Sequence, residues 1–164
     1  MTNVNERKCV LDKGAMLDAT STSALVPAGT TVETDGKEFT YIKTHAAALT
    51  VYQPYLLDHN GTNVASAAPA TGAGTVCVPQ QAIASGSYGW VQTKGDATCK
   101  IGAETYVAGD YLQILNAGTT AVVDGTTGST VELVTSAGVA KSGGTTAASI
   151  AVYLIGRKAD VAGS

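Results

Sequence analysis

The residues that could do chemistry in this chain are few and widely separated. The side chains most often used as nucleophiles, bases or metal ligands are His45, His59, Cys9, Cys77 and Cys99. No two cysteines are spaced as C-x-x-C, and a zinc site needs such pairs or nearby histidines. We therefore expect no metal site and no cofactor. We expect three reduced, buried thiols that pack as small apolar groups, with a disulfide as the alternative.

The acidic residues do not form a catalytic pair that the sequence can identify. Asp110, Asp124 and Glu132 stand singly, near expected turns or on expected strands, where solvated carboxylates are typical. The chain has no G-x-S-x-G motif, no phosphate-binding loop, no H-E-x-x-H motif and no dinucleotide-binding fingerprint. A pair of Cys77 with His45 is the nucleophilic arrangement left open. We predict that the protein is not an enzyme.

The composition favours a structural protein whose surface is covered by partners. Charged residues make up 14% of the 164 residues, against ~25% in typical globular proteins. The net charge is −3 and the basic residues are scattered, so we expect no nucleic-acid partner. The chain has no run of about 18 apolar residues, so we expect no membrane span. The N-terminal stretch lacks the apolar segment of a secretion signal, so we expect synthesis in a cytoplasm.

The remaining elements are organised around the stretch 86–101, which contains the only tryptophan, Trp90. Alternation places Tyr88, Trp90 and Gln92 on one face of a strand. Residues 94–96, Lys-Gly-Asp, have the composition of a turn. The sequence therefore predicts a β-hairpin with Trp90 in the core.

Short strand patterns recur along the chain. Asp35-Gly36 predicts a tight turn in a hairpin over residues 32–43. The segment 136–138, Ser-Ala-Gly, reads as a turn, and 150–155 is apolar on both faces, which is typical of a central buried strand. Further strands are expected at 75–79, 111–115, 121–123 and 130–134. The predicted fold class is all-β, a compact β-barrel or β-sandwich of many short antiparallel strands.

The chain divides into an extended N-terminal arm at residues 1–24 and a β-barrel or sandwich domain at 25–164. A long loop of small residues is expected at 60–74. The arm carries apolar pairs in a polar context, and we expect it to bind a partner by adding a strand to a sheet edge. The candidate partner-interface residues are those pairs and the hydrophobic residues near Pro54: Val10, Leu11, Met16, Leu17, Tyr52, Tyr55, Leu56 and Leu57.

Residues 81–95, Gln-Ala-Ile-Ala-Ser-Gly-Ser-Tyr-Gly-Trp-Val-Gln-Thr-Lys-Gly, resemble a segment of small head proteins of tailed bacteriophages. In those proteins the segment precedes a strand and then an x-A-G-D-x-L turn, which here is Ala108-Gly-Asp-Tyr-Leu112. The chain also resembles the family in its first strands, 39–43 and 47–50, and in its last segments, 137–140 and 150–155. The resemblance covers roughly residues 36 to 156.

The resemblance implies a capsid decoration or cement protein, which is β-rich, often trimeric and bound to the outside of the phage head. The implied partners are the major capsid protein and further copies of this chain in a homotrimer. The implied location is the virion exterior, after synthesis in the cytoplasm of the host bacterium. The family contributes no catalytic residues, and this chain departs from it in the leader 1–24 and the loop 60–74. The alternative is a carbohydrate-binding virion or surface module that uses Tyr52, Tyr55 and Trp90.

Overall fold

The computed structural model describes residues 17–44, 47–57, 64–65, 74–114, 121–123, 136–156 and 158–159. The elements with defined bounds in this part of the chain are all strands, which confirms the all-β class. In chain order they are β1 (Thr31–Thr34), β2 (Lys37–Lys43), β3 (Tyr55–Leu57), β4 (Val64–Ala65), β5 (Gly74–Cys77), β6 (Tyr88–Ile101), β7 (Tyr111–Ile114), β8 (Ala121–Val123), β9 (Ser136–Ala140), β10 (Ala148–Ile155) and β11 (Lys158–Ala159).

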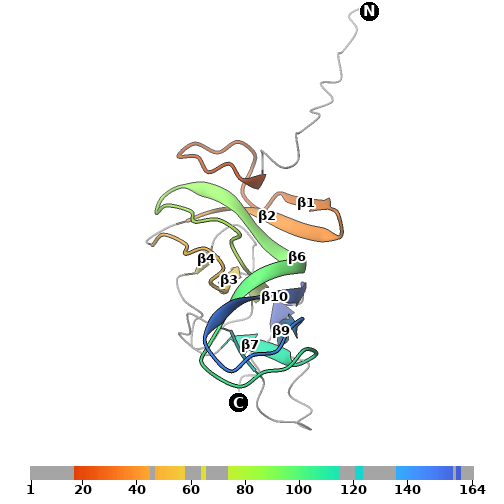
Figure 1. Cartoon of the computed structure of the whole chain (residues 1–164). Helices are drawn as coiled ribbons and strands as arrows, with labels where there is room; N and C mark the ends of the chain where they lie inside the picture. The colour runs from red at the N-terminus through yellow and green to blue at the C-terminus, as the bar shows by residue number, and fades with distance from the viewer. Residues whose placement is uncertain are drawn as a thin grey trace, which may run out of the picture.

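The strands form two sheets. The larger sheet has the order β1-β2-β6-β10-β9-β7-β8, and the smaller has the order β11-β5-β3-β4. In Figure 1, β6 runs through the middle, with β2 and β1 on one side and β10 and β9 on the other. The named strands pair antiparallel, except that β6 also meets β8 through one parallel pair, Ile101 with Ala121. The larger sheet is not closed into a barrel.

The predicted hairpin over 32–43 is confirmed. β1 and β2 pair antiparallel, and Asp35 and Gly36 form the two-residue connection between them. Both residues have positive φ, +52° and +73°. Two positive φ values match the twist of a two-residue hairpin, and Asp-Gly is among the residue pairs that adopt them most easily.

The predicted hairpin over 86–101 is wrong, because β6 is one continuous strand of 14 residues. Its first half pairs with β2 and its second half pairs with β10. Each half of β6 therefore forms its backbone hydrogen bonds with another strand, and the two halves do not pair with each other. Gly95 does adopt the positive φ of a turn residue, +86°, but it bends the strand near the point where the pairing partner changes.

The bend in β6 is stabilised from within the strand. The side chain of Gln92 donates from Nε2 to the carbonyl oxygens of Lys94, at 3.0 Å, and Asp96, at 2.8 Å. The register against β2 also shifts between Glu38 and Phe39, as in a β-bulge. The residue of β6 without a partner in β2 at this shift is Thr93, and the turn-like residues 94–96 that follow it continue the strand in register with β10 and do not reverse the chain.

Two expectations near the C-terminal end also need correction. The segment 136–138 is the start of β9 and not a turn. Gly138 is needed there because a Cβ would lie 2.6 Å from the carbonyl oxygen of Tyr153 on β10. β10 is central, as predicted, but only one of its faces is buried: Val152 and Leu154 are buried, whereas Ala151 and Tyr153 are exposed.

The core lies on both faces of β6. Val91 and Ile42 on one face of the larger sheet pack against Tyr55, Leu57 and Cys77 of the smaller sheet. On the opposite face, Trp90, Phe39 and Tyr41 form a second cluster, and Trp90 is 2% exposed. The prediction that Trp90 lies in the core is confirmed. A third cluster lies along the second half of β6 and includes Cys99, Ile101, Leu112, Val152 and Leu154.

The last part of the predicted arm contacts the domain. Leu17 packs against the cluster around Trp90, and Ser21 pairs with Tyr88 through two backbone hydrogen bonds of 3.1 and 2.7 Å. Residues 1–16 lie outside the described part of the chain. The expected strand 130–134 also lies outside the described residues. Of the expected loop 60–74, the structure describes only residues 64–65 and 74.

Candidate functional site

A row of apolar side chains crosses the outer face of the larger sheet. In the register of β10, β9 and β7, Val139 lies opposite Tyr153 on one side and opposite Tyr111 on the other. Directly paired residues share a face of the sheet. Tyr153 and Tyr111 are 44% and 43% exposed, and Val139 is half-buried. We call these three residues the tyrosine face, in which apolar side chains with exposed surface lie next to one another.

A charged pair borders the tyrosine face. Asp96 on β6 lies opposite Tyr153, and its Oδ2 accepts a hydrogen bond from Lys141 Nζ at 2.9 Å. Both side chains are about half exposed, so this ion pair contributes little to stability. An apolar centre with a charged rim is the usual anatomy of a protein–protein interface.

The turn that resembles the phage-protein motif positions Tyr111. The carboxylate of Asp110 accepts a hydrogen bond from the backbone N–H of Val107 at 2.8 Å. Gly109, with φ +100°, donates its N–H to the carbonyl of Ala140 in β9 at 2.8 Å. Asp110 is therefore occupied in closing the turn, and the motif fixes the start of β7 against β9.

The residues of the other motif, 81–95, also serve packing. Gly89 faces Ile83, and a Cβ on Gly89 would lie 2.7 Å from Ile83 Cδ1. Thr44 is buried, and its hydroxyl donates to the carbonyl of Ala84 at 2.6 Å. The pattern that carries the resemblance is thus explained in this chain by close contacts in the core.

Trp90 belongs to an aromatic stack that covers one face of β2 and β6. Its ring lies 5.0 Å from that of Tyr41, which in turn stacks on Tyr88 at 5.8 Å. The ammonium of Lys43 lies 5.4 Å from the centre of the Tyr88 ring, as in a cation–π contact. Trp90 Nε1 is the one buried side-chain polar atom in the described residues that has no hydrogen-bond partner.

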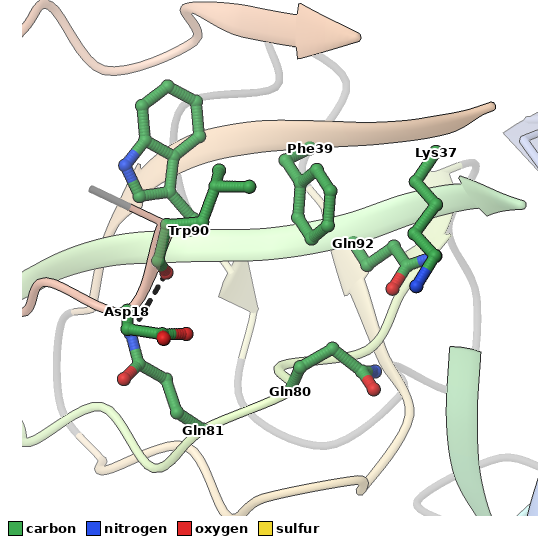
Figure 2. A pocket seen from close by; sticks show the side chains of 8 residues that line it. Asp18, Lys37, Phe39, Gln80, Gln81, Trp90 and Gln92 are labelled. Atoms are coloured by element: carbon green, nitrogen blue, oxygen red, sulfur yellow. Dashed lines mark hydrogen bonds between the residues drawn. The ribbon is translucent and has the colours of Figure 1, made fainter. Parts of the chain in front are cut away.

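A pocket of about 260 Å³ opens beside this stack (Figure 2). Phe39 and Trp90 form its aromatic wall, and the segment 80–81 lies across from them. Asp18 and Lys37 point into the pocket from opposite sides. The side-chain amide of Gln81 donates to the carbonyl of Leu17 at 3.2 Å, which ties the segment that carries Asp18 to the pocket wall.

Most of the predicted partner-interface residues that can be placed are covered by the chain itself. Tyr55, Leu56 and Leu57 form β3 and are buried, at 4%, 5% and 4% exposure. The hydroxyl of Tyr55 accepts a hydrogen bond from the backbone N–H of Thr50 at 2.8 Å. These three side chains therefore have partners within the chain, and burial of Tyr55 and Trp90 leaves no open aromatic platform of the kind that the carbohydrate-binding alternative supposed.

The other predicted interface residues fall into two groups. Tyr52 is half-buried with a φ of +63°, and its backbone bonds to Pro79 and Lys100. Leu17 is partly buried against the Trp90 cluster. Val10, Leu11 and Met16 lie outside the described residues. A role for any of these residues at a partner interface stays a prediction.

The sequence reasoning missed the tyrosine face. The sequence places Tyr111 and Tyr153 on expected strands and Val139 in the segment 137–140, and it gives no sign that the three side chains are neighbours. The available signal was the alternation of Ile150, Val152 and Leu154 with smaller or polar neighbours, which marks a strand with one open face. The pairing of β9 with both β10 and β7, which brings the two tyrosines into one row, cannot be read from the sequence.

Among the candidate chemical residues, the two cysteines that the structure describes are buried. Cys77 and Cys99 are free and buried, as expected, and burial raises the pKa of the Cys77 thiol strongly and that of Cys99 to about 12. The side chains of Cys9, His45, His59, Asp124 and Glu132 lie outside the described residues. Within the described ranges, no three His, Cys, Asp or Glu residues gather where they could hold a metal ion. No described helix is long and apolar enough to span a membrane.

The fold is similar to that of a protein of known structure. No family model and no curated protein matches the chain. The N-terminal base of the head fibre protein gp8.5 of bacteriophage phi29 is similar in structure, with a TM-score of 0.49 and 16% sequence identity. The alignment covers 73% of this chain and 95% of that chain.

Proposed function

We propose that this chain is a structural protein of a tailed-phage virion that decorates the outside of the head and stabilises the shell. On this proposal it binds the major capsid protein, assembles as a homotrimer, is made in the cytoplasm of the host bacterium and has no catalytic activity. The proposal starts from the resemblance of residues 81–95 and 108–112 to small phage head proteins. The observation that carries it further is the tyrosine face.

The tyrosine face fits attachment to a preformed surface. It lies on three neighbouring strands, which hold Tyr111, Val139 and Tyr153 in fixed positions before any partner binds. Such preorganisation lowers the entropy that binding costs. Burial of one large apolar side chain contributes about 1.5–3 kcal/mol, so the row can supply the centre of an interface with the capsid.

A decoration protein stabilises its target by mass action. A protein that binds the assembled lattice and not the free subunits adds about 2.7 kcal/mol per site at 100 times its dissociation constant. This mechanism needs an apolar contact with a polar rim and no reactive group. The tyrosine face and the Asp96–Lys141 pair meet that need.

The experiment is a co-sedimentation of the purified protein with heads that lack it, from the phage whose genome encodes the chain. We expect the wild-type chain to sediment with the heads and the double variant Tyr111→Ser with Tyr153→Ser to bind at least tenfold more weakly. Leu25→Ser is the matched control, because Leu25 is also an exposed apolar residue, at 55%, but does not belong to the row. Equal binding by the double variant and the wild type would refute this face as the attachment site, and no binding by the wild type would refute the proposed function.

A further inference from the structure

We propose that the free edge of β1 binds residues 7–11 of a second copy of this chain as an added β-strand. The inference rests on the homotrimer of the proposed function, and it names the surfaces through which the copies meet. β1 is the outermost strand at one end of the larger sheet, next to β2 (Figure 1). Residues 7–11, Arg-Lys-Cys-Val-Leu, lie outside the described part of the chain.

The backbone of β1 is hydrogen-bonded on one side only. Tyr41 of β2 donates its N–H to the carbonyl of Thr30 at 2.8 Å, and the residues of an antiparallel pair then alternate in the side to which their backbone groups point. The N–H and C=O groups of Thr31 and Glu33 therefore point away from β2. Among the described residues these groups have no hydrogen-bond partner, and such a row is a template for a further strand.

The side chain of Glu33 adds a charge that the sheet leaves unmatched. Glu33 lies directly opposite Glu38 of β2, and like charges in this position repel. Glu38 has other neighbours, because its Oε1 accepts a hydrogen bond from the hydroxyl of Thr93 at 2.7 Å and it lies opposite Lys94. Glu33 is exposed and has no hydrogen-bond or ion-pair partner among the described residues. A strand added at this edge is therefore favoured if it brings a basic residue opposite Glu33.

The other face of β1 is apolar. Val32 is half-buried and packs against the cluster of Phe39, Tyr41 and Trp90. Because successive side chains of a strand point to opposite faces, the residue opposite Val32 on an added strand is a direct neighbour of the residue opposite Glu33. The occupant of the edge therefore needs a basic residue next to a small apolar one.

Residues 7–11 meet this requirement. On the proposal, Lys8 lies opposite Glu33, and an antiparallel pair then places Cys9 opposite Val32. The charge of Lys8 offsets that of Glu33, and a free cysteine packs as a small apolar group. A slip by one residue would turn every side chain of the segment to the other face of the sheet, so the match of charge and apolar character selects this register.

A second copy can supply the segment without the constraint that holds the same copy. Ser21 pairs with Tyr88 on the side of β6 that faces away from β2, and the side chain of Gln81 binds the carbonyl of Leu17. From that side of β6 to the outside of β1 is about 19 Å, at four strand spacings. Residues 12–16 bridge roughly that distance only when they are fully extended.

Disulfide capture in the full-length protein tests the pairing, because Cys9 is a natural thiol of the segment. Val32→Cys places a second thiol opposite it. Under oxidation by copper phenanthroline, we expect linked dimers and larger species in electrophoresis without reductant. Val32→Cys combined with Cys9→Ser should lose these species. Thr31→Cys is the matched control, because Thr31 is the more exposed residue but its side chain points to the other face, so it should give far less linked protein.

Charge reversal tests the same contact without a change at Val32, and it decides the question if Val32→Cys does not fold. Glu33→Lys replaces an attraction to Lys8 by a repulsion. It should weaken self-association, measured by analytical ultracentrifugation at low salt, by roughly tenfold. Glu33→Lys combined with Lys8→Glu restores opposite charges and should recover most of that loss.

Three results would overturn the proposal. They are the absence of linked copies in Val32→Cys, an internal disulfide that leaves the protein monomeric, and self-association that Glu33→Lys leaves unchanged. If the wild type is nevertheless a trimer, the homotrimer stands and its copies meet at another surface. Linked copies that do not bind phage heads would contradict the decoration function and support this contact.

Discussion

At the scale of single residues, Trp90 belongs to the aromatic cluster that packs on one face of β2 and β6. It is 2% exposed, and it contacts Tyr41 within a cluster that also includes Phe39. Truncation of so large a buried side chain leaves a cavity as well as lost contacts. We therefore expect Trp90→Ala to lower the free energy of unfolding by about 3–5 kcal/mol.

Chemical denaturation followed by far-UV circular dichroism would measure this loss. Trp90→Phe is the control, because it keeps an aromatic ring in place and removes the unpartnered N–H, and it should cost clearly less than Trp90→Ala. A loss below about 1 kcal/mol for Trp90→Ala, which is typical of a surface substitution, would show that the cluster is not part of the core.

The two described cysteines give a second prediction at this scale, which concerns pH. Burial raises the pKa of the Cys99 thiol from its ordinary value of 9.0 to about 12, and it raises that of Cys77 as well. In the unfolded chain these thiols ionise near their ordinary value, so above it the unfolded state binds fewer protons than the folded state. Stability from each thiol is therefore fully present below pH 9.0 and declines as the pH rises toward 12.

Comparison of the wild type with Cys99→Ala isolates this contribution from other groups that titrate at high pH. Between pH 9 and 11 the wild type should lose stability more steeply, by up to about 1.36 kcal/mol per pH unit. Parallel pH profiles of the free energy of unfolding for the two proteins would contradict the assigned burial of Cys99.

In thiol titrations at neutral pH, the folded protein should react with no more than one equivalent of reagent, and the unfolded protein with three, since the chain has three cysteines.

At the scale of elements, β6 is organised by the bend at Gly95. A Cβ at this position would collide with the carbonyl oxygen of Gly36 in the β1–β2 turn, and the φ of +86° is itself unfavourable for any other residue. Gly109 has a similar φ, +100°, but open space around it. Substitution of Gly109 therefore introduces backbone strain alone, whereas substitution of Gly95 introduces backbone strain and steric overlap.

We expect Gly109→Ala to cost about 1–2 kcal/mol, from backbone strain alone. Gly95→Ala should cost about 2–5 kcal/mol, because overpacking adds to the strain. Thermal or chemical unfolding of the two variants measures the difference. Equal losses would mean that the approach of β6 to the β1–β2 turn is looser than described.

The N-terminal segment gives a further prediction at this scale. Leu17 packs on the Trp90 cluster, and Ser21 pairs with Tyr88. Removal of residues 2–24 should therefore destabilise the domain. If residues 1–16 act as an attachment arm, removal of residues 2–16 should weaken binding to capsids with little change in unfolding. Unchanged capsid binding after removal of residues 2–16 would refute the role of this segment as an attachment arm.

The elements that the sequence predicted correctly depend on short-range signals. Asp35-Gly36 makes a tight turn because both residues accept positive φ, and the neighbouring strands follow from it. Lys94-Gly95-Asp96 carries a similar signal, yet these residues continue β6, because β2 and β10 supply distant partners that local patterns cannot reveal. The prediction of a turn at Gly138 is wrong for the same reason, since the close approach of this residue to Tyr153 depends on which strand lies beside β9.

At the scale of the whole molecule, the same limit applies to the candidate site. Burial of Trp90 could be predicted from its size and from the alternation around it. The tyrosine face could not, because it exists only once β9 lies between β10 and β7 in one particular register. The interface residues chosen from their local apolar character, Tyr55 to Leu57, lie inside because the smaller sheet packs on the larger one.

The homotrimer is a prediction at this scale. Multi-angle light scattering of the purified protein should give a mass three times the 16.5 kDa of the chain. A monomer at concentrations at which the protein binds capsids would contradict the trimer, while leaving attachment to the head in place.

The central claim, that this chain decorates the outside of a phage head, is tested most directly by cryo-electron microscopy of the virion whose genome encodes it. The account predicts density for the two-sheet domain on the outer surface of the head, with Tyr111 and Tyr153 turned toward the major capsid protein. A virion in which this chain is absent, or lies in the tail or inside the shell, would contradict it.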